Sequence, residues 1–245
     1  MGICTVEVNL ESRQSITMST KSGLGDDAHS EGKATNKKTA KNTKHQILET
    51  AEKEFADNGF AGTTLRNLVK KAGVNLAAVG YHFGSKEELF RTVVAGIAQP
   101  IVYHELEAVD RLEQQAKERG EPLTLEQVLT AFLQPPLQYL MQEEQQWMVK
   151  ARLMGRCRTE TAPIQSLAAN EFSESFTRFL GLMEQAVPDQ SRSELHWKLD
   201  LVITILLRVL TEVGQPNALL QTNSTEAIEE AVAKLVKLLA AGIRA

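Results

Sequence analysis

The sequence predicts an all-α protein, and three patterns support this fold class. Apolar residues follow helical spacing between residues 65 and 72, and a glycine separates this segment from a second short one at 75–82. Apolar residues also step by four and three between residues 195 and 213. The remaining segments carry similar apolar patterns, so we expect helices throughout the ordered part of the chain.

The first segment, residues 1–42, is rich in Ser, Thr, Gly and Lys and poor in aromatic residues. This composition predicts a disordered polar and basic leader. Met18 is an alternative start to Met1, because little before it has structural content. A run of lysines without an intervening acid predicts either a mobile arm over DNA or a solvated tail: Lys33, Lys37, Lys38, Lys41 and Lys44.

Residues 43–91 predict three helices. The opening helix ends at an Asn-Gly pair, and Thr63 or Thr64 then caps a second helix. Gly73 ends that helix because glycine accepts the left-handed backbone of a sharp stop, and Asn75 caps a third helix. Two short helices about a glycine turn form the helix-turn-helix layout, in which the latter helix enters the major groove of DNA.

The charge distribution favours the same interpretation. Residues 33–91 contain eleven Lys or Arg and six Asp or Glu, whereas the rest of the chain contains sixteen and twenty-five. A basic end on a chain of net charge −4 indicates one region that is attracted to a polyanion and a body that is not.

The segment from about Lys44 to Arg91 resembles the amino-terminal domain of TetR-family transcriptional repressors. The matching motifs are ILETAEKEFADNGF, TTL and KKAGVNLAAVGYHFGSK, followed by EELF. Within the family, VNLAAVGYHFGSK is most similar to the subgroup with fatty-acid-responsive regulators. The resemblance implies an N-terminal three-helix DNA-binding domain at 43–91 and a C-terminal helical domain for effector binding and dimerisation at 92–245.

The matching motif, together with side-chain chemistry, predicts DNA contacts. Phosphate contacts are expected from Thr63, Thr64 and Arg66, and clamping of the DNA backbone from Tyr81, His82 and Lys86. Gly80 departs from the polar residues that similar sequences often carry there. The groove-facing residues are expected to be Asn75, Leu76, Ala77, Ala78 and Gly80.

We call the helix-turn-helix segment the reader. After it, a helix is expected from Ser85 or Lys86 to near Arg119, followed by one that Thr124 caps. Pro135 and Pro136 are expected to kink or divide the latter. The closing helices carry wide apolar faces, which predict a four-helix interface in a homodimer; an intramolecular core is the alternative. The apolar positions are Leu195, Leu199, Val202, Leu206, Val209, Val213, Ile228, Val232, Leu235 and Leu239.

An effector site is expected between residues 109 and 187, where aromatic residues and methionines gather. Arg152 and Arg156 suggest an apolar effector with an acidic group, but they are equally compatible with solvation or with pairing to nearby glutamates such as Glu160. The predicted ligand-binding residues are Phe132, Trp147, Arg152, Arg156, Phe172 and Phe176.

Other functional classes lack their motifs. The sequence has no phosphate-binding glycine loop, HExxH motif, paired cysteine ligands or nucleophile elbow, so we expect no enzyme, cofactor or metal, and His82 has no second ligand at usable spacing. No apolar run approaches the ~20 residues that cross a bilayer, which predicts a cytoplasmic protein. Two cysteines make a disulfide framework improbable, and Cys157, between two arginines, is either a redox sensor or an ordinary helix residue.

The sequence therefore predicts a ligand-responsive transcriptional regulator, with repression the common mode for such sequences. It would bind a near-palindromic operator in double-stranded DNA as a homodimer and leave it when a small molecule binds. The alternative is a helical protein-protein scaffold without specific DNA binding. The operator, the effector and the regulated genes are not written in the sequence.

Overall fold

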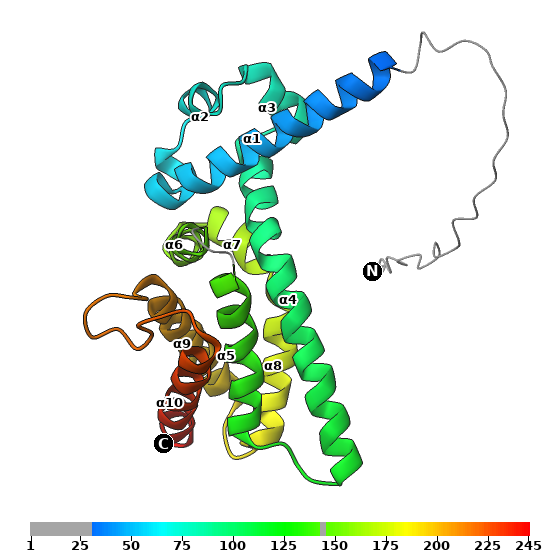
Figure 1. Ribbon diagram of the computed structural model, residues 1–245. Helices are drawn as coiled ribbons and strands as arrows, with labels where there is room; N and C mark the ends of the chain where they lie inside the picture. Colours follow the sequence, from blue (N-terminus) through cyan, green and yellow to red (C-terminus); the bar gives the residue numbers. More distant parts are fainter. Residues whose placement is uncertain (1–30, 143–145) are drawn as a thin grey trace, which may run out of the picture. The chain divides into compact units, whose positions relative to one another are not determined.

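The computed structural model describes residues 31–142 and 146–245, with side chains for 42–139, 142 and 146–245. All regular secondary structure in these residues is helical, which confirms the predicted fold class (Figure 1). The chain divides into two units, Met1–Thr39 and Ala40–Ala245, and the second unit carries the helices discussed below. Cys4, Met18 and most of the predicted leader lie outside the described residues.

The first helix, α1 (Glu31–Gly62), begins before the domain boundary predicted at residue 43. Residues 31–42, expected to be part of a disordered leader, are thus helical. The segment between Gly32 and Gly59 contains neither proline nor glycine, so nothing in it stops a helix from extending towards the N-terminus. Regular geometry ends at Gly59, where φ is 72° and ψ is 176°, a combination that is essentially restricted to glycine.

Two short helices follow, α2 (Leu65–Ala72) and α3 (Leu76–Phe83). Their buried residues Leu68, Val79 and Phe83 belong to the same apolar core as Phe55 of α1. Phe55 packs edge-to-face against Phe90 of the next helix, with ring centroids 5.1 Å apart. This core holds one side of α3 against the rest of the domain and leaves the other side exposed to solvent.

The long helix α4 (Lys86–Arg119) has the bounds that the sequence predicts, with Ser85 as its N-cap and Gly120 as its C-cap. Its later turns lie among the C-terminal helices, where it packs against α5 and α8. The remaining helices are α5 (Leu125–Gln142), α6 (Trp147–Cys157), α7 (Ile164–Asn170), α8 (Ser173–Ala186), α9 (Arg192–Thr211) and α10 (Thr225–Arg244).

Of the two outcomes predicted for Pro135 and Pro136, division of the helix does not occur, because both lie inside a single helix, α5. The apolar segment between Pro163 and Val187 forms two helices, α7 and α8, which are separated at residues 171–172. Here Phe172 packs against the apolar core, although its backbone has left helical geometry. Tertiary packing thus overrides the apolar pattern of the segment.

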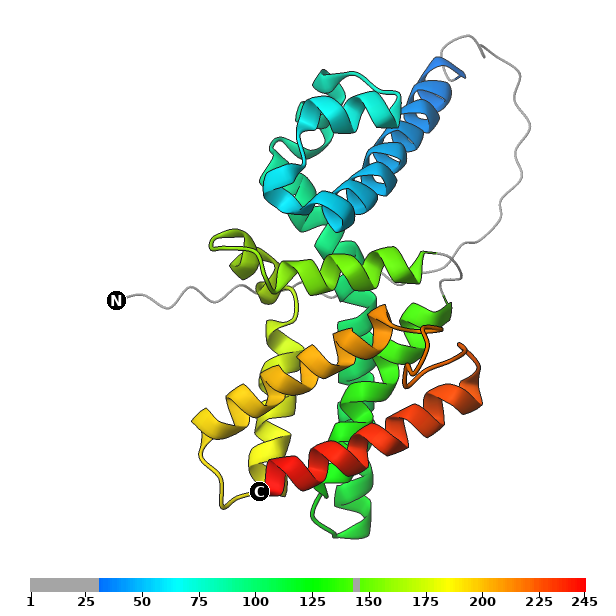
Figure 2. The ribbon, with the colours of Figure 1, turned by 90° about the vertical axis from the view of Figure 1, so that its left-hand side faces the viewer.

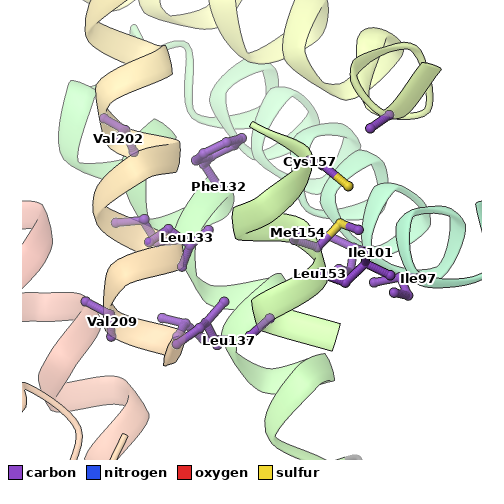
Figure 3. Close-up of a cluster of buried hydrophobic side chains, with 14 of the residues drawn as sticks. Ile97, Ile101, Phe132, Leu133, Leu137, Leu153, Met154, Cys157, Val202 and Val209 are labelled. Atoms are coloured by element: carbon purple, nitrogen blue, oxygen red, sulfur yellow. The ribbon is translucent and has the colours of Figure 1, made fainter. Parts of the chain in front are cut away.

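The C-terminal core lies between α4, α5, α6 and α9. Ile101 of α4, Phe132 of α5, Met154 of α6 and Val202 of α9 come together in it (Figure 3). The apolar stripes of the closing helices also lie inside, since Leu195 is fully buried and Leu235 of α10 is 4% exposed. These stripes, on which the predicted dimer interface was based, therefore belong mainly to the protomer's own core.

A different set of apolar side chains remains exposed on the closing helices. Trp197 is 55% exposed and Leu201 is 47% exposed on α9, and Leu238 is 67% exposed on α10. Figure 2 shows α9 and α10 running across the same face of the helical bundle. Among the described residues, no helix is long and apolar enough to span a membrane.

The geometry of Gly59 leads to a stability prediction. Replacing Gly59 by Ala adds a Cβ in a glycine-only backbone region and only 2.9 Å from Glu160 Oε1. We expect Gly59→Ala to lower the free energy of unfolding by about 2–3 kcal/mol, measured by urea denaturation. Gly73→Ala is the matched control, because Gly73 has φ +67° but nothing within 4 Å of an added Cβ. It should cost only about 1 kcal/mol, and equal losses would contradict the prediction.

Candidate nucleic-acid interface and effector cavity

The turn between α2 and α3 is built from three local signals. The Thr64 side chain accepts a hydrogen bond from the Asn67 backbone N–H and caps α2. Gly73 ends α2 in the left-handed conformation. Asn75 Oδ1 then accepts a hydrogen bond of 2.8 Å from the Ala78 backbone N–H and caps α3. The two helix starts are therefore fixed by side chains, and the turn by a glycine backbone, at residues that the sequence itself indicates.

One face of α3 is open. Leu76 is 53% exposed and Tyr81 is 83% exposed, while Ala77 and Gly80 are exposed between them. Val79 and Phe83 occupy the opposite, buried face. Ala78 is half-buried. The small residues Ala77 and Gly80 would let the backbone of this face lie close to another surface.

The two predicted phosphate-binding threonines differ. Thr64 is exposed next to Arg66, which is also exposed. Thr63 is only 1% exposed, and its hydroxyl donates to the backbone oxygens of Gly59 (2.8 Å) and Glu54 (3.0 Å). The prediction of a phosphate contact by the Thr63 side chain is therefore wrong, because its hydroxyl fastens the turn that follows α1.

The predicted DNA-backbone clamps are also unequal. Tyr81 projects outward, and the half-buried His82 ring meets it edge-to-face at 4.9 Å. Lys86 is half-buried, and its Nζ lies 4.2 Å from the centroid of the Phe60 ring. Burial lowers the pKa of Lys86 from its ordinary value, although Glu87 and Glu160 oppose this effect. Lys86 thus packs against the domain as well as carrying a charge at the start of α4.

A large cavity lies among the C-terminal helices and has a volume of about 660 Å³. Of the predicted ligand residues, Phe132, Phe172 and Phe176 line it. Trp147 is buried elsewhere in the core and does not line it. The volume and the largely apolar lining are typical of sites for small organic molecules.

Two buried polar residues in this cavity were missed in the sequence analysis. Glu105 of α4 is 3% exposed and Ser175 of α8 is 1% exposed, and the Ser175 hydroxyl donates a hydrogen bond to Glu105 Oε2. The sequence signal was available, because Glu105 interrupts an apolar row at four-residue spacing that runs through Ile97, Ile101 and Val109. Burial raises the pKa of Glu105 to about 8, against the lowering effect of the Ser175 hydrogen bond.

Comparison with known proteins agrees with both halves of this architecture. The family model described as "Bacterial regulatory proteins, tetR family" matches residues 47–93, and the model "Tetracyclin repressor-like, C-terminal domain" matches residues 130–242. The chain belongs to the TetR family of transcriptional regulators. Both descriptions name domains of regulatory or repressor proteins.

Individual relatives support this membership. The TetR-family chain is 32% identical over 144 residues to the HTH-type transcriptional regulator AcrR of Shigella flexneri, a match that covers 58% of this chain and 63% of the relative. It is 26% identical to the HTH-type transcriptional repressor AcnR of Corynebacterium efficiens, over 60% of this chain and 62% of the relative. The matches thus span a little under two thirds of these curated relatives.

The fold is shared with solved structures at lower sequence identity. The transcriptional regulator FadR from Bacillus subtilis, in complex with stearoyl-CoA, has a TM-score of 0.53 and 13% identity. The match covers 81% of this chain and 98% of that chain. At this identity the likeness concerns the fold alone.

The predicted arginine ligands of this TetR-family regulator lie outside the cavity. Arg156 Nε donates to the Ala56 backbone oxygen and Nη2 donates to that of Asp57, each at 2.6 Å. Glu160 Oε1 accepts a hydrogen bond of 2.7 Å from the Phe60 backbone N–H. We call Arg156 and Glu160 the α1 clamp. They bind backbone groups at the end of α1 that the helix cannot pair by itself.

Arg152 belongs to the same surface and not to the cavity. It forms an ion pair with Asp57 at 3.4 Å, and both side chains are about half exposed. Arg152 and Arg156 line a separate surface hollow of about 290 Å³. These two arginines therefore do not line the large cavity, and their contacts fit the alternative of pairing with local partners.

Cys157 does not have the environment of a redox sensor. It is 5% exposed, and burial, followed by the charge of Glu160, raises the pKa of its thiol to about 12. The neighbouring arginines point to other partners, since Arg158 pairs with Asp200 at 2.5 Å. The thiolate required for redox chemistry is therefore disfavoured. No group of three or more His, Cys, Asp or Glu side chains able to hold a metal occurs within the described part of the chain.

The α1 clamp leads to a second stability prediction. Arg156→Met removes two charge-assisted hydrogen bonds to helix-terminal oxygens, and we expect a loss of about 1–2 kcal/mol in the free energy of unfolding. Arg152→Met is the matched control, because it removes only an exposed ion pair and should cost no more than about 0.5 kcal/mol. Urea denaturation of the two variants under the same conditions makes the comparison. Indistinguishable losses would show that the clamp does not stabilise the folded chain.

Proposed function

We propose that this TetR-family regulator is a ligand-responsive repressor. It binds a near-palindromic operator as a dimer and is released when a small molecule enters the cavity. The observation that carries the proposal is the open face of α3, which two capped helices and a glycine turn hold outward. The curated relatives named above as a transcriptional regulator and a transcriptional repressor support it.

The open face of α3 suits the major groove. Leu76 and Ala77 offer apolar contact to thymine methyl groups, and the amide nitrogen of Asn75 remains free of the cap that its oxygen makes. Thr64, Arg66 and Tyr81 are exposed, and their side chains suit phosphate contacts. A protein-protein scaffold, the alternative function, would leave this arrangement without a role.

A dimer is supported by the exposed apolar residues of α9 and α10. Trp197 and Leu201 are one helical turn apart on α9, and Leu238 belongs to the neighbouring α10. Large apolar side chains exposed on adjoining helices are typical of a surface that another protein covers. A two-fold axis there would present two α3 helices to successive major grooves, roughly 34 Å apart.

The α6 helix offers a route from the cavity to the reader. Met154 and Cys157 of α6 line the cavity, while Arg156 lies on the same two turns and holds the end of α1. A ligand that displaces α6 would therefore pull on backbone oxygens of the DNA-binding domain. Such small shifts at a packed interface are one way in which binding at one site changes another.

For the effector we propose a largely apolar molecule, because the cavity is mainly apolar. An acidic group has weaker support, since Arg152 and Arg156 hold α1 and Arg158 is paired with Asp200. Assignment to the fatty-acid-responsive subgroup rests on the reader motif alone. Acyl carboxylates and acyl thioesters are thus one class to screen.

Selection from random-sequence DNA at near-physiological salt tests the proposal, because salt sets the non-specific background. We expect enrichment of a near-palindrome with half-sites about one helical turn apart.

Leu201→Glu should yield monomers in light scattering and weaken operator binding at least about tenfold, because it places a charge in an apolar interface. Leu219→Glu, at an exposed leucine outside α9 and α10, is the control and should remain dimeric. A dimeric Leu201→Glu protein would contradict the assigned interface, and failure to enrich any motif would favour the scaffold.

Gly80 provides a sharper test of how closely α3 approaches DNA. Nothing lies within 4 Å of a Cβ added at Gly80, so Gly80→Ala should stabilise the free protein by about 0.5–1 kcal/mol. If the α3 backbone meets the groove, the same change should weaken operator binding at least about tenfold, as a gel-shift titration would measure. Gly96→Ala in α4 has equally open space and should stabilise without changing DNA affinity. Unchanged affinity in both variants would place the close contact elsewhere.

A further inference from the structure

The large cavity contains one acidic group that the known architecture leaves unexplained. Its walls are mainly apolar, with Ile101, Phe132, Met154, Phe176 and Leu206 among them. Glu105 lies in this wall at 3% exposure, where an isolated charge is strongly disfavoured. A leucine there would continue the apolar row of α4, so packing alone gives no reason for a carboxyl group.

The immediate partners of Glu105 leave half of its carboxyl group open. The Ser175 hydroxyl donates to Oε2, and no other described residue donates to the group or forms an ion pair with it. Ser175 comes from α8 and Glu105 from α4, so their hydrogen bond fixes the carboxyl group from across the cavity wall. One carboxyl oxygen is thus held by a hydrogen bond, while the other makes none to a described residue.

The other charged groups around the cavity cancel. Arg158 Nη2 lies 2.5 Å from Asp200 Oδ1 and also donates to the Asp200 backbone oxygen at 3.4 Å. The His196 ring packs edge-to-face on Phe176, with centroids 4.9 Å apart. A ligand therefore meets a balanced ion pair, an imidazole and the unbalanced carboxyl group of Glu105.

We propose that the cavity recognises an apolar molecule bearing a protonated amine, whose N–H groups donate to the Glu105 carboxylate. This deepens the function proposed above and rests on it for the cavity's regulatory role. A carboxylate ligand would instead meet Glu105 with no unpaired arginine or lysine among the described lining residues. A neutral ligand would bury the same apolar surface without compensating the acid.

The proton balance of this binding is specific. Because burial raises the pKa of Glu105 to about 8, the empty site mostly holds a proton at pH 7. An arriving ammonium group favours the ionised carboxylate, and the displaced proton passes to the buffer. Binding of an amine that is already protonated at pH 7 should therefore release close to one proton per ligand at that pH.

Three probes with one tail separate the ligand classes: decylammonium, decanol and decanoate. We expect calorimetry on the full chain to show decylammonium binding at least tenfold more tightly than decanoate. Titrations in two buffers of different ionisation enthalpy should show the released proton. Equal or tighter binding of decanoate, or no binding of decylammonium, would overturn the proposal.

The variant Glu105→Gln keeps the size of the side chain and removes its charge. It should weaken decylammonium binding about tenfold or more, abolish proton release and leave decanol binding within about twofold. Glu107→Gln is the matched control on α4, because Glu107 lies outside the cavity and pairs with Tyr103 and His104. Should Glu105→Gln misfold by circular dichroism, Glu105→Met offers an apolar replacement of similar length. Unchanged amine affinity in a folded Glu105 variant would remove Glu105 from the site.

The calorimetry uses no DNA, so the proposed ligand class can be contradicted without contradicting the proposed repressor function, and the reverse. If decylammonium binds through Glu105 and the selected operator is also released, the ligand class and the effector role are both supported. If it binds through Glu105 without releasing the operator, the ligand class stands and the effector role falls. If no operator can be selected at all, the DNA-binding proposal falls while the calorimetry still decides the chemistry of the cavity.

Discussion

The structure depends on how the end of α1 is paired. Gly59 turns the chain away from the helix, which leaves carbonyl groups of the last turn without partners in α1 itself. The hydroxyl of Thr63 bonds to two backbone oxygens of α1, and the side chain of Arg156, which belongs to α6, donates to two others. A helix of the N-terminal region is therefore completed by a side chain of the C-terminal region, which couples the geometry of the two.

The α6 helix therefore has two roles, lining the cavity and binding the end of α1, and these roles fall on different faces of the helix. Residues 154 and 157 face the cavity, whereas residues 152 and 156 share the opposite face and reach α1. A rigid helix can pass a displacement from one face to the other without an intermediate chain of contacts. The arrangement also explains why the arginines are poor ligand candidates, since recruiting Arg156 to the cavity would strip α1 of its cap.

The parts of the fold that the sequence predicted are those governed by local chemistry. Thr64, Gly73 and Asn75 act within a few residues of their own positions, so their capping roles follow from residue type alone. Arg156 has partners 99 and 100 residues away that the tertiary fold brings to it, and residue type alone indicates no more than a charge. Thr63 has partners only four and nine residues away, but residue type alone does not indicate that its hydroxyl is buried against them. The dimer interface was assigned to the wrong residues of α9 and α10 for a related reason. Apolar periodicity does not distinguish the core of one protomer from an interface between two.

Glu105 illustrates what can be learned by combining the two levels. Its place in a four-residue apolar row signals burial, but only the structure identifies Ser175 as its partner and an apolar cavity as its surroundings. Burying a carboxyl group disfavours folding unless it is protonated or compensated, so its presence weakens the empty state relative to one with a cation bound. Protonation relieves this cost while the site is empty, and a cationic ligand would relieve it with the carboxyl group ionised, which is the basis of the proposed selectivity.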